Sequence, residues 1–268
     1  MRWNFSSRAR QLSRGEAIII SIPKSGRTWL RAFLCAYYCK RDGLEMTLEP
    51  ERLGQHGIPR IIYSHDRFEA RTKGNFWDRM RGKYLVPPGE LKRADIILLA
   101  RDPRDAFVSL YVQMTRRTHE TPAEYKGKTA GELLRDKAFG IISIINVMNG
   151  WLKEFSTRPN FTLARYEALR NDPAKHFRDI LCVLGENPPQ FEAYEHALAF
   201  SEFKNMKKLE AAGAFQSKIL QPGDVADPES FKVRRGQVGG YRDDLSVEDQ
   251  DYAAAAMRAL NTRFGYAP

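Results

Sequence analysis

Residues 17–29 read AIIISIPKSGRTW, and this stretch decides the fold. Its first six residues are small or apolar and rich in β-branched isoleucine, which is typical of a buried strand. Apolar and aromatic residues then recur at helical spacing, on one face that holds Trp29, Leu30, Phe33, Leu34, Tyr37 and Tyr38. The sequence therefore predicts a strand, a polar turn and a helix, the repeating unit of a parallel sheet covered by helices.

The rest of the chain repeats this alternation. Further strand-like runs cover residues 60–63, 95–100 and 160–164, and helical patterns cover 106–116, 138–155 and 173–184. Ser246 with Asp249 predicts the N-cap of a final helix. We predict an α/β fold with a central parallel sheet flanked by helices. A length of 268 residues suits one large domain of this class, so a single domain over residues 1–268 is expected.

Residues 211–241 differ from this pattern. They are rich in glycine and polar residues and carry no clear hydrophobic period. Long segments without secondary structure are uncommon in compact domains unless they bind something. We therefore interpret this stretch as a functional loop folded back on the domain.

The charge balance favours an anionic partner, because 43 Lys and Arg residues face 33 Asp and Glu residues, a net charge of +10. The basic residues are scattered, so no nucleic-acid partner is expected. The amino terminus lacks an apolar signal region, and the longest apolar stretches, such as 141–148, are too short to span a bilayer. Cys35, Cys39 and Cys182 form no Cys-x-x-Cys pair, and Cys35 and Cys39 are interpreted as small buried hydrophobes on a helix. A cytoplasmic protein without a membrane span is predicted.

The turn at residues 23–29 is the strongest candidate site. A loop between a strand and a helix points successive backbone N–H groups at one spot, where the helix dipole also favours negative charge. Gly26 allows a ligand close to the backbone, and the side chains that add donors are Lys24, Ser25, Arg27 and Thr28. An ordinary turn with solvated charges is the alternative, but this density of donors favours an anion site.

A nucleotide kinase or ATPase with a Walker loop is the competing function. Gly26, Arg27 and Thr28 align with the end of that motif, but Ser21 replaces its first glycine and Arg27 replaces its lysine. A Walker site also needs a carboxylate at the end of a buried strand to hold Mg²⁺. At the end of the predicted strand 95–100 the chain has Arg101, which suits an anion better than a metal ion.

Arg101 opens a second candidate turn, because residues 101–111 read RDPRDAFVSLY. A guanidinium group can bind two phosphate oxygens at once. Ser109 lies about two helical turns further on and can reach the same pocket. The alternative is a surface ion pair between Arg101 and Asp105. Taken together with the first turn, Arg101 favours an anion site over this ion pair.

With these two motifs, the chain resembles the sulfotransferases that use 3′-phosphoadenosine-5′-phosphosulfate (PAPS), which have a P-loop-like fold. That family pairs a Pro-Lys-Ser-Gly-Thr-Thr-Trp loop, which holds the 5′-phosphosulfate, with an Arg-x-Pro-x-Asp-x-x-x-Ser-x-Tyr segment, which holds the 3′-phosphate. Here Arg27 replaces the first threonine of the loop. The family's third element, Arg-Lys-Gly-x-x-Gly, corresponds to residues 234–239, RRGQVG, so the resemblance implies that Arg234, Arg235 and Gly236 contact the cofactor.

The resemblance also implies a binding site for the adenine base. Its members would be Trp29, Tyr166 in the segment Arg165-Tyr166-Glu167, and Ser201 with Phe203 in residues 201–206, SEFKNM. Aromatic faces suit base stacking, although cores use them as well, so plain core packing remains an alternative for Trp29 and Phe203.

The resemblance further implies the catalytic groups. Lys24 would neutralise charge on the phosphate oxygens, Ser109 would contact the 3′-phosphate, and His65 would take the acceptor's proton. A histidine has an ordinary pKa of about 6.5, which suits a base at neutral pH. Tyr63 stands where the family has a lysine, so one positive contact is missing, and Arg27 could compensate. No cluster with metal-ligand spacing is seen, and no metal is expected.

The acceptor is not readable from the sequence, beyond a small molecule or a carbohydrate with a hydroxyl or amine. The stretches 68–84 and 114–125 mix aromatic and basic residues, and either lines an acceptor pocket or covers the core. The family's Lys-Thr-Val-Glu dimer motif survives only in degraded form, as Arg242, Ser246, Val247 and Asp251. A weak homodimer at most is expected.

Overall fold

The computed structural model describes residues 16–49, 53, 57–116, 125–215, 217–221, 223–224, 227 and 230–268. Part of the predicted loop 211–241 and of the stretch 114–125 lies outside these residues, as do His56 and His119. None of the described helices is both long and apolar enough to cross a membrane.

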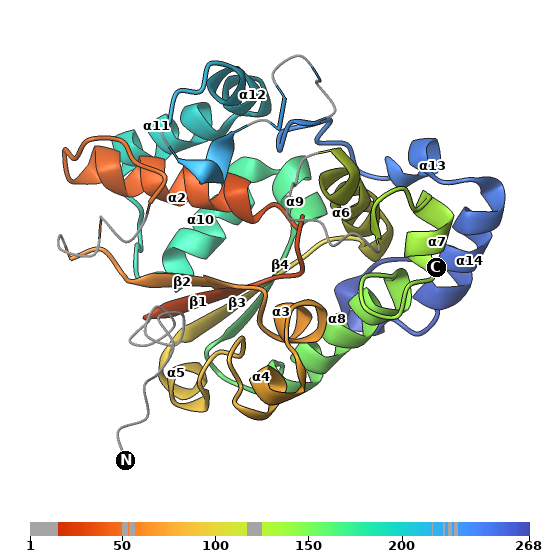
Figure 1. The fold of residues 1–268 in the computed structure, drawn as a ribbon. Helices are drawn as coiled ribbons and strands as arrows, with labels where there is room; N and C mark the ends of the chain where they lie inside the picture. The colour runs from red at the N-terminus through yellow and green to blue at the C-terminus, as the bar shows by residue number, and fades with distance from the viewer. Residues whose placement is uncertain are drawn as a thin grey trace.

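In the described residues, four parallel strands form one sheet (Figure 1). The strands are β1 (Ala17–Ile20), β2 (Ile61–Ser64), β3 (Asp95–Ala100) and β4 (Phe161–Arg165), in the spatial order β2-β1-β3-β4. Ile18 of the central strand β1 lies opposite Ile62 of β2 and Ile96 of β3. The predicted parallel sheet is confirmed. Because the strands run in parallel, their carboxyl ends meet at one edge, where ligands bind in open α/β sheets.

Both faces of the sheet are buried beneath helices (Figure 1). Successive residues of a strand point to opposite faces, so Ile18 and Ile20 pack into one hydrophobic cluster and Ile19 into the other. The first cluster includes side chains of α6 (Pro103–Arg116) and α8 (Ile141–Phe155). The second includes side chains of α2 (Arg27–Arg41), α10 (Pro173–Val183) and α11 (Phe191–Ser201). Burial on both faces explains the unbroken isoleucine run of β1.

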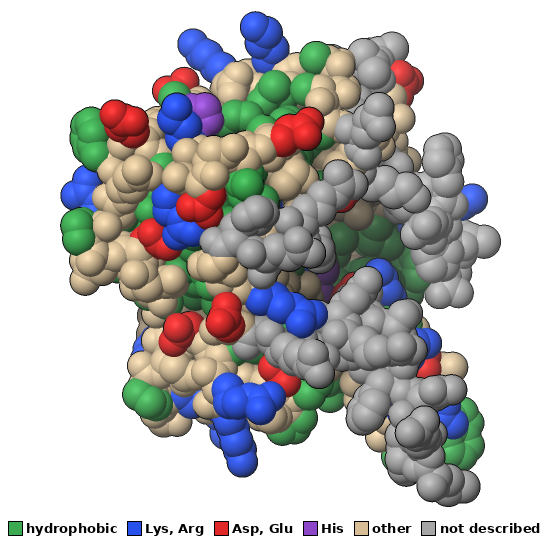
Figure 2. Space-filling view, turned by 90° about the vertical axis from the view of Figure 1, so that its left-hand side faces the viewer, with side chains coloured by type: hydrophobic (Ala, Val, Ile, Leu, Met, Phe, Trp, Pro, Cys, Tyr) green, Lys and Arg blue, Asp and Glu red, His purple; other side chains and the backbone are tan. Residues whose placement is uncertain are grey.

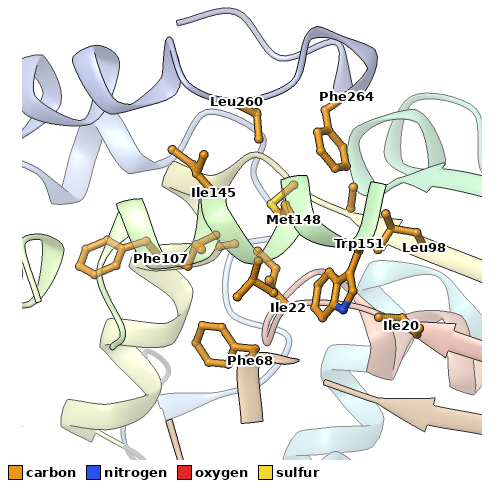
Figure 3. Packing of buried hydrophobic residues seen from close by; sticks show 14 of the residues in the cluster. Ile20, Ile22, Phe68, Leu98, Phe107, Ile145, Met148, Trp151, Leu260 and Phe264 are labelled. Carbon is orange, nitrogen blue, oxygen red and sulfur yellow. The ribbon is translucent and has the colours of Figure 1, made fainter. Parts of the chain in front are cut away.

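The first cluster packs around a tryptophan of α8. Ile20, Ile22 and Leu98 lie beside Trp151 of α8, whose side chain has no exposed surface (Figure 3). Full burial of such a large side chain stabilises the fold by about 1.5–3 kcal/mol or more. The indole Nε1 of Trp151 also donates a hydrogen bond to Asp66 Oδ2 at 2.8 Å, which links α8 to the residue after His65.

The remaining helices lie around these layers. They are α3 (Asp66–Thr72), α4 (Phe76–Met80), α5 (Pro88–Arg93), α7 (Ala130–Leu134), α9 (Tyr166–Asn171), α12 (Phe203–Ala211), α13 (Tyr241–Asp244) and α14 (Val247–Met257), with 3₁₀ turns η3 (Lys218–Leu220) and η5 (Thr262–Phe264). The predicted N-cap of the last helix is confirmed, because Ser246 Oγ accepts a hydrogen bond from the backbone N–H of Asp249.

Two helix starts differ from the sequence prediction. Helix α6 begins at Pro103 rather than at residue 106, since proline has no N–H to leave unsatisfied in the first turn. Helix α8 begins at Ile141 rather than at residue 138, because the Asp136 carboxylate accepts the backbone N–H groups of Ala138 and Phe139 and holds them in a turn.

Candidate active site

A cavity of about 550 Å³ lies where the loops that follow the four strands converge. Every predicted site residue except Ser25 and Ser201 lines it, namely Lys24, Gly26, Arg27, Thr28, Trp29, His65, Arg101, Ser109, Tyr166, Phe203, Arg234, Arg235 and Gly236. In the space-filling view, hydrophobic and basic side chains can be seen within a hollow of the surface (Figure 2). Residues from distant parts of the sequence therefore share one pocket.

The first turn has the backbone of an anion-binding loop. Lys24 and Gly26 both adopt positive φ angles, 71° and 93°, and Gly26 is the N-cap of α2. A Cβ atom at Gly26 would lie 2.6 Å from Tyr166 Cδ2, so only glycine fits. Helix α2 has no side-chain cap and no acidic residue in its first turn. Its N–H groups and positive dipole end therefore face the cavity without a carboxylate to neutralise them.

Ser25 occupies a different position from its neighbours. Its side chain is fully buried and its Oγ makes no hydrogen bond within the described part of the protein. A buried hydroxyl without a partner is destabilising unless a ligand or a water molecule satisfies it. Ser25 belongs to the turn although it does not line the cavity.

Arg101 connects the second turn to the first. One guanidinium nitrogen, Nη1, donates hydrogen bonds to the Lys24 carbonyl oxygen at 2.9 Å and to Ser109 Oγ at 3.2 Å. The other, Nη2, reaches the Gln237 carbonyl oxygen at 3.4 Å, and the guanidinium carbon lies 4.5 Å from the centre of the Tyr166 ring. The predicted convergence of Arg101, Ser109 and the lysine turn is therefore present in the geometry.

The Asp105 carboxylate binds backbone N–H groups rather than forming the alternative ion pair with Arg101. Both oxygens of Asp105 accept backbone N–H groups, Oδ2 from Gly239 at 2.7 Å and Oδ1 from Tyr241 at 2.9 Å. Arg101 is therefore oriented by carbonyl oxygens, a hydroxyl and an aromatic ring. Its positive charge faces a cavity that Lys24 and Arg27 also line.

The predicted base-binding residues form an aromatic corner of the cavity. Trp29 and Tyr166 meet edge to face, with ring centres 5.9 Å apart. Trp29 Nε1 donates a 2.7 Å hydrogen bond to the Ser201 carbonyl oxygen, so Ser201 acts through its backbone. Phe203 lies over Gly236, where an added Cβ would approach its ring to 2.4 Å.

Arg170 completes this corner and was not identified from the sequence. Its guanidinium group lies over the rings of Trp29 and Phe203, at 5.7 and 5.4 Å from their centres. Arg170 follows Tyr166 by four residues on α9, which places both on one helix face. That spacing was the available signal.

His65 is held in one orientation at the end of β2. Its Nδ1 lies 2.7 Å from the Ser21 carbonyl oxygen. A carbonyl oxygen can only accept, so Nδ1 carries the hydrogen and Nε2 is the nitrogen with a lone pair. Asp66, the next residue, is anchored by Trp151 and by the backbone N–H of Val86, which donates to Asp66 Oδ1 at 2.9 Å.

The wall near His65 mixes apolar and polar side chains and was only partly foreseen. It consists of Phe68, Glu69 and Thr72 from α3 with its C-cap Lys73, Val108, Leu110, Gln113 and Met114 from α6, and Phe139. Of the aromatic residues in the stretch 68–84, Phe68 lines the cavity. Phe76 and Trp77 are 68% and 63% exposed and neither lines it nor belongs to the core.

Tyr63, which stands where the family pattern has a lysine, does not line the cavity. The guanidinium carbon of Arg31 lies 4.1 Å from the centre of its ring, and burial raises the pKa of Tyr63. Arg27 does line the cavity, and its compensating role stays a prediction. No group of three or more His, Cys, Asp and Glu residues in the described ranges could hold a metal ion.

Comparison with known proteins identifies the class that this fold and site define. A family model described as "Sulfotransferase domain" matches residues 14–265. The chain therefore belongs to the sulfotransferase domain family, and the predicted resemblance is confirmed. Family membership also favours sulfuryl transfer over the kinase alternative.

Named relatives agree with this assignment. Sulfotransferase 2B1 of Rattus norvegicus is 25% identical over 258 residues, which cover 88% of this chain and 68% of the rat protein. Cytosolic sulfotransferase 17 of Arabidopsis thaliana is 24% identical, with 86% and 69% covered. Among solved structures, mouse sulfotransferase SULT7A1 complexed with PAP superposes with a TM-score of 0.63 at 20% identity, covering 94% of this chain and 89% of that one. Retinol dehydratase in complex with androsterone and PAP gives 0.59 at 16% identity, with 96% and 82% covered. These likenesses confirm the fold.

Proposed function

We propose that this sulfotransferase uses PAPS as its donor and sulfates a hydroxyl or amine on a small acceptor. The observation that carries the proposal is the Arg101 guanidinium group, which bonds to the lysine turn, to Ser109 and to the segment 234–237 around one cavity. A nucleotide with charged groups at both its 5′ and its 3′ position would meet cationic residues at each end.

The residues present fit this donor. Gly26 and Gly236 let the backbones of both turns pack directly against the rings of Tyr166 and Phe203, where a Cβ would clash. The buried, unpartnered Ser25 Oγ supplies a donor at the first turn. Lys24, Ser25 and Thr28 would hold the 5′-phosphosulfate. The 3′-phosphate would be held by Arg101, Ser109, Arg234 and Arg235, and the adenine would lie among Trp29, Tyr166 and Phe203.

PAPS, when bound, supplies the sulfuryl group that the acceptor atom takes from phosphate, leaving 3′,5′-phosphoadenosine phosphate (PAP). The protein's part is positioning and charge stabilisation, as in phosphoryl transfer. His65 Nε2 would accept the acceptor's proton, since the Ser21 carbonyl oxygen keeps the hydrogen on Nδ1. Lys24 would neutralise the charge that develops on the leaving phosphate.

The acceptor side of the cavity favours a compact, mainly apolar molecule over a carbohydrate. Its walls include Phe68, Leu110, Met114 and Phe139, which offer apolar surface close to His65. The cytoplasm is the proposed compartment, supported by the lack of a disulfide among Cys35, Cys39 and Cys182 and by relatives named as cytosolic. A single domain over 1–268 is consistent with the family match, and a weak homodimer stays a prediction.

The direct test is sulfate transfer from labelled PAPS to a panel of phenols, alcohols and amines, read by mass. We expect an 80-dalton gain on at least one acceptor class and tighter binding of PAP than of ATP with Mg²⁺. Binding of ATP with Mg²⁺ in preference to PAP would contradict the proposal. Lys24→Ala should abolish transfer in the same assay.

A further inference from the structure

Two buried carboxylates accept backbone hydrogen bonds on either side of the segment that carries Arg234 and Arg235. Glu210 of α12 has no exposed surface, and its Oε1 and Oε2 accept the backbone N–H groups of Lys232 at 2.7 Å and Val233 at 2.9 Å. Asp105 of α6 does the same on the far side, for Gly239 and Tyr241. Each carboxylate therefore holds two N–H groups of an otherwise irregular chain.

The segment between these two anchors has no helix or strand of its own. Residues 234–238 contain Arg234, Arg235, Gly236 and Gln237, all of which line the cavity, and Gly236 has a φ of 60°. Without ladder or helix hydrogen bonds, such a segment is positioned by the groups that accept its flanking N–H donors and by its side-chain contacts. Here Arg234 and Arg235 also pair with Asp244 Oδ2, at 3.3 and 3.4 Å. Charged acceptors make the stronger bonds.

The position of this segment matters because Arg101 reaches only one of its carbonyl oxygens. Arg101 Nη2 lies 3.4 Å from the Gln237 carbonyl oxygen, at the long end of hydrogen-bond distances. The carboxylate anchors, at 2.7–2.9 Å, are shorter. The Asp105 anchor also joins distant parts of the chain, since Asp105 and Gly239 are 134 residues apart in sequence.

We infer that Glu210 and Asp105 are positioning residues that fix Arg234 and Arg235 for the 3′-phosphate of the donor. This inference rests on the proposed function for the identity of the ligand. Both carboxylates act through backbone N–H groups of the arginine segment. Their effect should therefore be specific to ligands that carry a 3′-phosphate.

A carboxylate is the side chain that this role requires. Each oxygen accepts one N–H group, whereas an amide has one acceptor oxygen and one NH₂ donor. Glu210→Gln and Asp105→Asn therefore keep the shape but turn a donor toward a buried backbone N–H group. An N–H group left without an acceptor is destabilising, so the segment should move.

The test compares PAP with 5′-AMP, which lacks the 3′-phosphate, by calorimetric titration of the full chain. For Glu210→Gln and Asp105→Asn we expect the PAP Kd to rise about tenfold, as for one charged hydrogen bond, and the 5′-AMP Kd to change less than twofold. Glu90→Gln serves as the matched control. Glu90 is also a buried carboxylate, but it pairs with Arg93 on α5 and does not line the cavity. Equal losses for PAP and 5′-AMP would overturn the inference, since they would indicate general unfolding.

A double-mutant cycle separates positioning from simple packing. In an Arg234→Ala, Arg235→Ala background, Glu210→Gln should weaken PAP binding by less than twofold, because the groups it positions are gone. A full tenfold loss in that background would contradict the inference.

Hydrogen exchange gives a readout that does not depend on the donor. Peptides covering 231–241 should exchange faster in both amide variants than in the parent and in Glu90→Gln. If the parent protein fails to prefer PAP over 5′-AMP, the proposed function is wrong. The exchange result alone then decides whether Glu210 and Asp105 hold this segment in place. Unchanged exchange in both variants would refute them.

Discussion

The Lys24 carbonyl oxygen accepts a 2.9 Å hydrogen bond from Arg101, 77 residues further along the chain. This bond joins the turns that follow β1 and β3, two neighbouring strands of the sheet. The positive φ of Lys24 turns its carbonyl toward Arg101 while its side chain lines the cavity. One arginine therefore fixes the relative position of the two turns as well as contributing charge.

Replacement of Arg101 by lysine should separate its role in fixing the two turns from its role as a positive charge. Lysine keeps the positive charge but loses the planar fork that reaches Lys24, Ser109 and the Tyr166 ring. We expect PAP affinity to fall by about 10- to 100-fold, the equivalent of one charged hydrogen bond worth about 1.5–3 kcal/mol. Titration with PAP measures this loss.

Arg158→Lys is the matched control for Arg101→Lys. Arg158 is a half-buried arginine that, like the buried Arg101, donates to a backbone carbonyl, that of Leu91 at 2.7 Å, but it does not line the cavity. It should bind PAP as the parent does. If Arg101→Lys does so too, the guanidinium geometry is not needed.

Gly26→Ala tests the close approach between the first turn and Tyr166. The new Cβ would lie 2.6 Å from the Tyr166 ring, and the alanine would have to adopt a positive φ of 93°. We expect the free energy of unfolding to fall by about 1–2 kcal/mol from the backbone and about 1–3 kcal/mol more from the clash. PAP binding should be lost with it.

Gly43→Ala separates these two effects. Gly43 has a similar positive φ of 64°, but apart from its chain neighbours no atom of the described residues lies within 4 Å of an added Cβ. It should lose only the backbone part in a urea titration and keep PAP binding. Equal stabilities for the two variants would mean that the Tyr166 contact has no energetic consequence.

The two turns could be predicted from the sequence because their chemistry lies in consecutive residues. Lys24, Ser25 and Gly26 follow a recognisable strand, and Arg101 follows another, so local patterns suffice. Glu210 could not be predicted, because its role depends on how α12 packs beside residues 232 and 233.

The acceptor wall was equally out of reach of local patterns. Phe68 and Phe76 look alike in the sequence, both being phenylalanines among basic residues. Phe68 is buried and lines the cavity, whereas Phe76 is 68% exposed. Phe68 lies on the buried face of α3, whereas no residue of α4 is buried, and no local signal in this stretch distinguishes the two helices.

His65→Asn should separate chemistry from donor binding. Loss of the proposed base should lower kcat by about 10²- to 10⁴-fold, whereas PAP affinity should change little because Arg101 and Lys24 remain. His196→Ala is the control, since His196 is exposed on α11 and away from the cavity. Single-turnover rates at saturating PAPS measure the effect, and near-parental kcat in His65→Asn would remove it from the mechanism.

Glu167→Gln should change how stability depends on pH. Burial raises the pKa of Glu167, although its Oε1 accepts the Asp102 N–H and its Oε2 accepts the Tyr266 hydroxyl. A raised folded-state pKa means that the folded protein binds more protons than the unfolded chain, so this group lowers stability as pH rises from about 4.5 through the folded pKa. Glutamine has no charge to desolvate, its oxygen can accept the Asp102 N–H, and its NH₂ can donate to the Tyr266 oxygen. The Tm of Glu167→Gln relative to the parent should therefore be higher at pH 7.5 than at pH 4.5, by calorimetry. A Tm difference that does not change with pH would show that burial does not raise the pKa of Glu167.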